Sequence, residues 1–462
     1  IMDFRKEALK YKDDFLKDLN ALVSIESTRD KEHAAKGMPF GPNPAKALET
    51  MLDMGKRDGF ETENVDGYAG VIRYGDKEES VGILGHLDIV PLGDGWTKDP
   101  LKVTVEDGYV FGRGVLDDKG PTLAAYYALR LVKEAGIPLK RKVMLIAGCD
   151  EESGMECMDY YADHGEIPTL GFTPDADFPV IYGEKGNILL SLHSRENTKI
   201  KSFNAGTRPN IVIQKADAVV DANDPKEDLF DFYLRTHGLT GTISKEEDGV
   251  HLHMEGTAAH GAMPFLGTNA GVHLLNFIGQ AYGDQLAKDY YELLKDWKGT
   301  PEGIMTNGVY MGFLTMNPGV IQLEDGDLHV LIDIRYPNDV TPEFVLEGFE
   351  NAAQQKDSDI TVIMDSAGKP LFVDPNSELV TGLMASYRKY TGDDFTPAIT
   401  IGGGTYAKKF ENFVAFGPEK IGEKKTTDAF VGGCHQRDEG VKLDDLMEAI
   451  AIYADAIVNL AG

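Results

Sequence analysis

Five short segments of the sequence carry side chains that could bind metal ions. They are GHLDIVP with His86 and Asp88, GRGVLDDKG with Asp117 and Asp118, CDEES with Asp150, Glu151 and Glu152, PDADFP with Asp175 and Asp177, and GGCHQRDEG with His435. Taken alone, each has a commoner structural explanation, such as a hydrogen-bonded core histidine, a helix N-cap or a solvated acidic run. Together, however, adjacent carboxylates repel one another unless cations lie between them. No surplus of Lys or Arg accompanies them, so the set predicts two divalent cations. Imidazole and carboxylate ligands suit zinc, manganese or cobalt.

The segments that must position these side chains alternate between helix and strand patterns. Helices are expected at about 5–23, at about 45–58 and in KGPTLAAYYALRLVKEAG, which should stop at Gly136. Strand-like runs such as VGILGH and KVMLIAG lie between or after them. This alternation predicts an α/β domain with a mixed, largely parallel sheet flanked by helices. His86, the acids at 150–152 and Asp175 each follow such a run, so they should converge at one edge of the sheet.

The hydrophobic pattern of the sequence changes at about residue 185. Longer alternating runs, such as GVHLHMEG and DGDLHVLIDIRYP, indicate antiparallel strands, with helices expected at about 224–236, 269–282 and 342–355. Alternating helix and strand patterns return after about residue 373. We therefore expect a discontinuous catalytic domain of residues 1–184 and 373–462, and an inserted α+β lid domain of residues 185–372.

Composition excludes several classes of partner. The 462 residues carry a formal net charge of −30, which argues against nucleic acid and anionic membranes because both require basic patches. Three cysteines are too few for a disulfide framework, and the first residues lack the apolar region of a secretory signal. We expect a cytoplasmic protein.

The ordered motifs resemble those of the co-catalytic metallopeptidase family that contains aminoacylases, carnosinases and dipeptidases, and within it the bacterial dipeptidase V branch. The resemblance covers essentially the whole chain. It implies that His86 and Asp175 hold one metal, that Glu152 and His435 hold the other, and that Asp118 bridges them. It also implies that Asp88 orients His86 and that Glu151 is the general base. Two ions about 3.5–4 Å apart can share a water and make hydroxide available near neutral pH.

The same resemblance assigns roles to residues of the insert and of a late glycine loop. His260 would stabilise the oxyanion, while Asn210 and Arg335 would bind substrate from the lid, Arg335 by a bidentate grip on a free carboxylate. Gly402, Gly403 and Gly404 would form a loop whose backbone approaches the substrate. The long insert resembles lids that take the place of a partner subunit, so a monomer is expected.

The leading hypothesis is hydrolysis of dipeptides that have a free amino terminus, with zinc as the first choice of metal. In the family, Asp at position 175 goes with substrates that keep a free α-amine, whereas Glu there goes with deacylases. An N-acyl-amino-acid deacylase on the same fold stays open as an alternative. A non-catalytic amino-acid or peptide binder is a further one.

Overall fold

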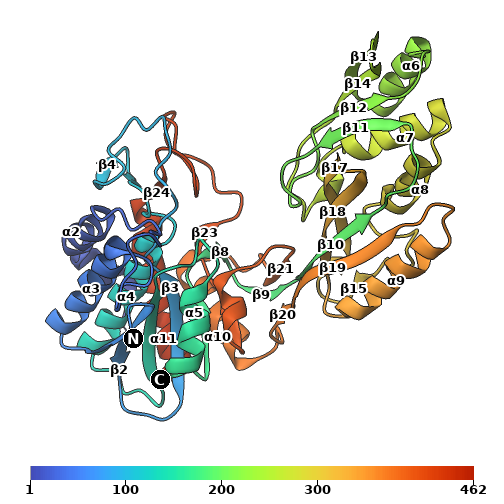
Figure 1. Cartoon of the computed structure of the whole chain (residues 1–462). Helices are drawn as coiled ribbons and strands as arrows, with labels where there is room; N and C mark the ends of the chain where they lie inside the picture. Colours follow the sequence, from blue (N-terminus) through green and yellow to red (C-terminus); the bar gives the residue numbers. More distant parts are fainter. Residues whose placement is uncertain (1) are drawn as a thin grey trace. The chain divides into compact units, whose positions relative to one another are not determined.

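The computed structural model describes residues 2–462, which divide into two compact units. Unit 1 contains the residues up to Tyr182 together with Val373–Ile399 and Thr405–Gly462. Unit 2 contains Gly183–Phe372 and Thr400–Gly404. In Figure 1 the blue beginning and the red end of the chain belong to the same unit, whereas most of the green-to-orange part forms the other. The short segment 400–404 groups with unit 2, although the sequence interpretation assigned it to the catalytic domain.

Unit 1 is built from helices and short strands. Its helices are α1 (Phe4–Lys10), α2 (Lys12–Val23), α3 (Pro42–Arg57), α4 (Lys119–Glu134), α5 (Glu156–His164), α10 (Glu378–Thr391), η2 (Tyr406–Lys409) and α11 (Leu443–Ala461). Its strands are β1 (Glu61–Val65), β2 (Ala69–Tyr74), β3 (Ser80–His86), β4 (Thr104–Glu106), β5 (Tyr109–Phe111), β6 (Lys142–Gly148), β7 (Leu170–Thr173), β8 (Ala176–Phe178), β22 (Phe413–Ala415), β23 (Pro418–Lys420) and β24 (Gly440–Lys442). Two further strands, β9 (Ile181–Glu184) and β21 (Ile399–Ile401), span points at which the chain passes between the units.

The main sheet of unit 1 has the order β1-β2-β6-β3-β7-β22-β9. Its centre is parallel, because β3 pairs in parallel with both β6 and β7, and β22 pairs in parallel with β7. Strands β1 and β2 extend it in antiparallel register. The mixed, largely parallel sheet and its flanking helices confirm the fold class predicted from the sequence.

Helices cover both faces of this sheet. A Cβ added at Gly85 would meet Thr122 of α4, and one at Gly70 would meet Leu48 of α3. On the other face, a Cβ at Gly148 would meet the hydroxyl of Tyr406. The small residues of the strands therefore allow helices to approach closely on both sides, which fixes the strand ends that carry the candidate site.

Unit 2 is organised around an antiparallel sheet. Its strand order is β13-β14-β12-β11-β17-β18-β10-β19. The strands are β10 (Gly186–His193), β11 (Ile200–Ala205), β12 (Lys215–Val220), β13 (Thr240–Glu246), β14 (Gly249–Glu255), β15 (Asn307–Gly308), β16 (Gly312–Phe313), β17 (Thr315–Glu324), β18 (Asp327–Tyr336), β19 (Thr361–Gly368) and β20 (Leu371–Phe372). The helices are α6 (Glu227–His237), η1 (Pro264–Leu266), α7 (Ala270–Tyr282), α8 (Gln285–Leu294) and α9 (Pro342–Gln354).

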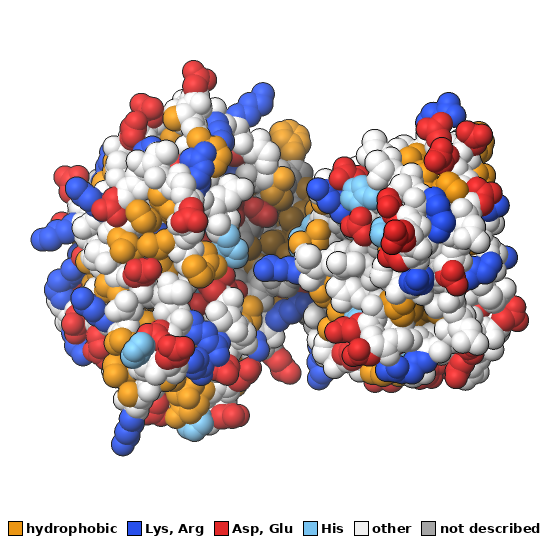
Figure 2. All heavy atoms as spheres, turned by 45° about the horizontal axis from the view of Figure 1, so that its top comes forward, with side chains coloured by type: hydrophobic (Ala, Val, Ile, Leu, Met, Phe, Trp, Pro, Cys, Tyr) orange, Lys and Arg blue, Asp and Glu red, His pale blue; other side chains and the backbone are white. Residues whose placement is uncertain are grey.

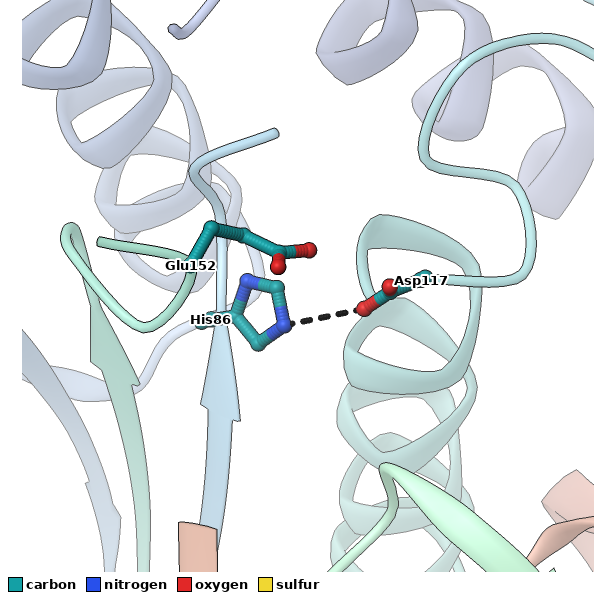
Figure 3. A group of neighbouring side chains, drawn as sticks. All are labelled: His86, Asp117 and Glu152. Carbon is teal, nitrogen blue, oxygen red and sulfur yellow. Dashed lines mark hydrogen bonds and ion pairs between the residues drawn. The ribbon is translucent and has the colours of Figure 1, made fainter. Parts of the chain in front are cut away.

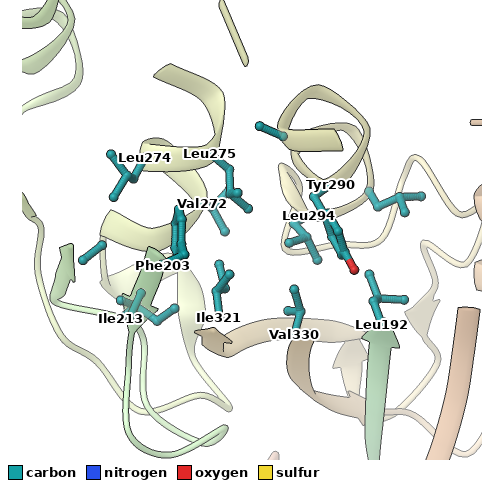
Figure 4. Close-up of a cluster of buried hydrophobic side chains, with 14 of the residues drawn as sticks. Leu192, Phe203, Ile213, Val272, Leu274, Leu275, Tyr290, Leu294, Ile321 and Val330 are labelled. Carbon is teal, nitrogen blue, oxygen red and sulfur yellow. The ribbon is translucent and has the colours of Figure 1, made fainter. Parts of the chain in front are cut away.

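A separate apolar core stabilises unit 2. Residues of α7 and α8, including Leu274, Leu275 and Tyr290, pack against strand residues such as Ile321 and Val330 (Figure 4). These side chains are buried, so the sheet of unit 2 presents one face to its helices. Each unit thus has its own core.

None of the helices formed by residues 2–462 combines the length and the apolar character needed to span a bilayer. On the face of the molecule that Figure 2 shows, acidic and basic side chains alternate over each unit rather than forming one large basic patch.

Candidate metal centre

The candidate ligands of unit 1 gather at the carboxyl ends of the parallel strands. His86 is the last residue of β3 and stands in register with Gly148, the last residue of β6. Glu151 and Glu152 follow β6, and Asp175 follows β7. Asp117 and Asp118 end the loop that leads into α4, while His435 lies in the loop before β24. The structure therefore brings together side chains that are up to several hundred residues apart in the chain.

One group of ligand atoms surrounds the buried ring of His86. Its Nε2 lies 3.1 Å from Oδ1 of Asp117 and 3.3 Å from Oδ2 of Asp175. The same nitrogen is 3.6 Å from Oε2 of Glu151. A second set of neighbours, His86, Asp118 and Asp175, also offers atoms close enough together to hold an ion.

A second group surrounds His435, and Asp117 belongs to both groups. Nε2 of His435 lies 3.0 Å from Oδ2 of Asp117 and 3.1 Å from Oε2 of Glu152. Asp117 thus turns one carboxylate oxygen toward each histidine. Figure 3 shows the contact between His86 and Asp117 and places Glu152 beside the imidazole of His86. His86, Asp117 and Glu152 together form a set that could hold a metal ion.

Asp118 has different surroundings from Asp117. Its Oδ2 accepts hydrogen bonds from the backbone N–H of His86, at 3.2 Å, and from the hydroxyl of Thr122, at 2.9 Å. Its Oδ1 is buried and has no hydrogen-bond partner within residues 2–462. Although Asp118 occupies the N-cap position of α4, its side chain accepts no helix N–H there.

Asp88 connects the two sides of the centre. Its Oδ1 lies 3.3 Å from Nδ1 of His86. The same carboxylate accepts the backbone N–H groups of Glu151 and Glu152, each at 3.0 Å. Nδ1 of His86 hydrogen-bonds the backbone carbonyl of Asp88, at 3.0 Å, while the carboxylate of Asp88 fixes the turn that carries Glu151 and Glu152. Asp150 instead pairs with Arg29, at 2.8 Å.

Burial and mutual repulsion shift the pKa values of these acids. Burial raises the pKa of Glu151 to about 8, and the neighbouring charges of Asp175 and Glu152 add to that effect. Burial likewise raises the pKa of Asp175 to about 6. Burial also disfavours the ionised form of Asp117, but hydrogen bonds from His435 and His86 outweigh it and lower the pKa of that carboxyl. Asp117 is therefore the acid whose charge these histidines stabilise most.

The expected substrate-binding residues gather in unit 2. The backbone N–H of Gly261 donates to the carbonyl of Asn210, at 2.7 Å, which joins the segments that carry Asn210 and His260. Arg335 donates through Nη1 to the carbonyl of Gly402, at 3.1 Å. A Cβ added at Gly402 would lie 3.3 Å from that of Ala262. Glycine at 402 thus permits the close approach that brings these segments together.

Hydrogen bonds within this group leave specific donors available. Nδ1 of the exposed His260 accepts the backbone N–H of Ala262, at 3.0 Å, so a neutral ring carries its proton on Nε2. Asp333 takes two of the five N–H groups of Arg335, at 2.7 and 3.0 Å, and Gly402 takes a third. Two N–H groups of Arg335 remain to bind an anion.

Sequence comparison identifies the family. The model of peptidase family M20/M25/M40 matches residues 82–459. The chain belongs to this family. It is 36% identical over its full length to the full length of YtjP, a candidate dipeptidase of Bacillus subtilis (strain 168). A candidate dipeptidase of Staphylococcus epidermidis is also 36% identical, over 99% of both chains.

Solved structures of two dipeptidases share the fold. Human carnosine dipeptidase 1 aligns with a TM-score of 0.53 and 15% identity, over 99% of this chain and 98% of that one. Aminoacylhistidine dipeptidase from Vibrio alginolyticus aligns with a TM-score of 0.52 and 15% identity, over 96% and 95%. The chain is accordingly a metallopeptidase that acts on peptide bonds.

The residues present fit a pair of divalent metal ions. Five carboxylates converge here, from Asp117, Asp118, Glu151, Glu152 and Asp175. Within residues 2–462 their ion pairs are with His86 and His435, not with Lys or Arg. The adjacent Lys119 turns away and donates to the carbonyls of Leu22 and Ile25, both at 2.8 Å. Cations held by the cluster would supply the missing positive charge.

Sequence reasoning passed over Asp117 as the central carboxylate. The Asp-Asp pair was the signal for a ligand at this place, but its spacing does not say which of two neighbours faces the histidines. The comparison of contacts favours Asp117. The structure also brings close together the side chains of the remaining expected ligands, His86, Glu152, Asp175 and His435.

Proposed function

We propose that this M20 peptidase hydrolyses dipeptides that have a free amino terminus. The observation that carries the proposal is the carboxylate of Asp117, which lies between two histidines that each have a further carboxylate beside them. This is the donor set of a two-ion centre with one shared ligand. The candidate dipeptidases to which the chain is similar over its full length support the choice of substrate.

Each ion would have its own histidine and carboxylate. His86 and Asp175 would hold one ion, His435 and Glu152 the other, and Asp117 would bridge them in place of Asp118. Two divalent ions there would lower the pKa of a shared water toward about 7 and polarise the scissile carbonyl. Zinc is our first choice and manganese and cobalt are the others, because all three accept imidazole and carboxylate ligands.

Glu151 would act as the general base. It lies next to a ligand in sequence, and its Oε2 is within 3.6 Å of the ring of His86. Burial already favours a proton on this carboxyl. In its ionised form Glu151 would take the proton of the attacking water and deliver it to the leaving amine.

Unit 2 would supply the groups that hold the ends of the dipeptide. The two remaining N–H groups of Arg335 suit the free α-carboxylate, and Nε2–H of His260 suits the developing oxyanion. Asn210 and the backbone of Gly402, Gly403 and Gly404 would complete the contacts with the peptide. The short side chain of Asp175 would leave room for the free α-amine.

The substrate assignment can be tested with metal-free protein. After reconstitution with zinc, manganese or cobalt in separate samples, hydrolysis of a plain dipeptide is compared with hydrolysis of its N-acetylated form. We expect the plain dipeptide to be cleaved faster. Faster cleavage of the acetylated form would favour an N-acyl-amino-acid deacylase, and binding without turnover of either would favour a non-catalytic binder.

Substitution of the proposed base gives a second test. Glu151→Gln should lower kcat by about 10²–10⁴-fold, the usual contribution of a general base, while two metal ions stay bound. Glu152→Gln is the matched control, because it should lose one ion as well as activity. Full turnover by the Glu151→Gln protein would contradict the assignment of the base.

We also propose that the chain acts as a monomer, because unit 2 is large and has a core of its own. Sedimentation velocity over a hundredfold concentration range should show one species of about 50.6 kDa. A concentration-dependent species of twice that mass would contradict this.

A further inference from the structure

A buried ion pair beside the metal centre joins three loops of unit 1. Arg113 and Glu439 are each only 1% exposed, and Nη1 of Arg113 lies 3.0 Å from Oε1 of Glu439. The three loops are residues 87–96, 112–118 and 432–439. They contain Asp88, Asp117 and His435 respectively, so each carries a residue of the candidate centre.

Arg113 reaches two of these loops from the third. Nη1 donates to the carbonyl of Gln436, at 3.1 Å, as well as to Glu439. Nη2 donates to the carbonyl of Leu92, at 2.9 Å. The guanidinium carbon of Arg113 lies over the ring of Trp96, 5.0 Å from the centre of that ring. A planar guanidinium is suited to this role because its donors are held in a fixed fork.

Glu439 binds the backbone that leads to Asp117. Its Oε2 accepts the N–H groups of Gly114, at 2.9 Å, of Leu116, at 3.0 Å, and of Asp117 itself, at 3.2 Å. Its own carbonyl accepts the N–H of Gly112, at 3.1 Å. The carboxylate and the backbone carbonyl of Glu439 together therefore fix both ends of the 112–118 loop and tie it to the loop that carries His435.

We propose that Arg113 and Glu439 are positioning residues that set the distance between the two halves of the metal centre. Asp117 meets His86 and His435 with different oxygens, so its carboxylate must stay in place relative to both. The ion pair links the backbone of Asp117 to the 432–439 loop on one side and to the 87–96 loop on the other. This inference rests on the proposed two-ion centre.

Metal binding by a Glu439→Gln protein tests the inference. The amide would direct an N–H either at Nη1 of Arg113 or at the backbone donors of the 112–118 loop, so one set of contacts is lost. We expect Zn²⁺ affinity, measured by competition with a chromogenic chelator, to fall about 10–100-fold, as for other residues that orient metal ligands. The visible spectrum of the Co²⁺ protein should change, and kcat should fall with little change in KM.

Asp18→Asn is the matched control. Asp18 also pairs with an arginine in unit 1, because both of its oxygens lie 2.9 Å from Arg57, but this pair joins α2 to α3. The control protein should lose stability yet keep its Zn²⁺ affinity and Co²⁺ spectrum. Unchanged metal affinity of the Glu439→Gln protein, or an equal loss in the Asp18→Asn protein, would overturn the inference.

Two further comparisons keep the test decisive. If the Glu439→Gln protein does not fold, Arg113→Lys replaces it, because one ammonium cannot reach Glu439, Gln436 and Leu92 together. We expect the same loss of metal affinity, and its absence would contradict our inference. Failure of the unaltered protein to bind two ions or to cleave dipeptides would instead contradict the proposed function.

Discussion

At the scale of single residues, we predict effects of different size for substitutions of the two neighbouring aspartates. Asp117 touches both histidines, whereas Asp118 accepts hydrogen bonds from His86 N–H and Thr122. We expect Asp117→Asn to lower metal affinity at both positions by at least about 100-fold, because a shared ligand is lost. Asp118→Asn should have a smaller effect, about 10-fold. Metal content after dialysis, measured by atomic emission, distinguishes them. Loss of both ions from the Asp118 variant alone would restore Asp118 as the bridge.

Asp88 gives a second prediction at this scale. Its carboxylate accepts two backbone N–H groups of the 151–152 turn and lies beside Nδ1 of His86. Asp88→Asn places an amide N–H against one of these donors, so activity should fall about 10–100-fold while both ions remain. Steady-state kinetics with excess metal provide the measurement. Recovery of full activity at high metal concentration would show that Asp88 affects only metal affinity.

At the scale of elements, hydrophobic periodicity and turn residues in the sequence predict several helices and strands correctly. It anticipates β3 and β6, the end of α4 before Gly136, and the change to antiparallel strands in unit 2. The expected helix at 5–23 is two helices, with Tyr11 between them, because an amphipathic pattern continues across a short break. The expectations did not include α8, which follows α7 after Gly283 and Asp284.

In the candidate site, too, some features could be predicted from local sequence pattern and others could not. Strand ends could be predicted to converge, because that depends on local pattern and on the parallel order of the strands. The choice of Asp117 over Asp118 and the link from Arg113 to Glu439 depend on contacts between residues far apart in the chain. A buried Arg or Glu looks like any other charge until its partner is known.

The turn between α8 and β15 yields a pH-dependent prediction. Glu302 is 5% exposed, and neither of its carboxylate oxygens has a hydrogen-bond partner within residues 2–462. Burial raises the pKa of Glu302 to about 8 from an ordinary value of 4.5. Unfolding therefore allows this carboxyl to ionise once the pH exceeds about 4.5. Its contribution to stability is full below that pH and is lost as the pH rises to about 8.

Glu302→Gln should remove this dependence. Relative to the variant, the unaltered protein should lose stability by up to a few kcal/mol, in order of magnitude, between about pH 4.5 and 8. Urea unfolding of unit 2, followed through the fluorescence of Trp297 in a Trp96→Phe background, measures the difference at each pH. If the free energy of unfolding changed with pH in the same way in both proteins, Glu302 would not be the cause of the pH dependence.

At the scale of the whole molecule, all the candidate metal ligands belong to unit 1, and each unit has a core of its own. Ions that bind only the folded protein stabilise it by about 4 kcal/mol when their concentration is 1,000 times Kd. Chelation should therefore lower the unfolding temperature of unit 1 by several degrees and leave that of unit 2 nearly unchanged.

The two tryptophans separate the signals, since Trp96 lies in unit 1 and Trp297 in unit 2. Thermal unfolding of Trp96→Phe and Trp297→Phe proteins, with and without chelator, gives the comparison. Equal shifts in both would mean that the units unfold as one cooperative body, and a shift reported by Trp297 alone would place the ions in unit 2.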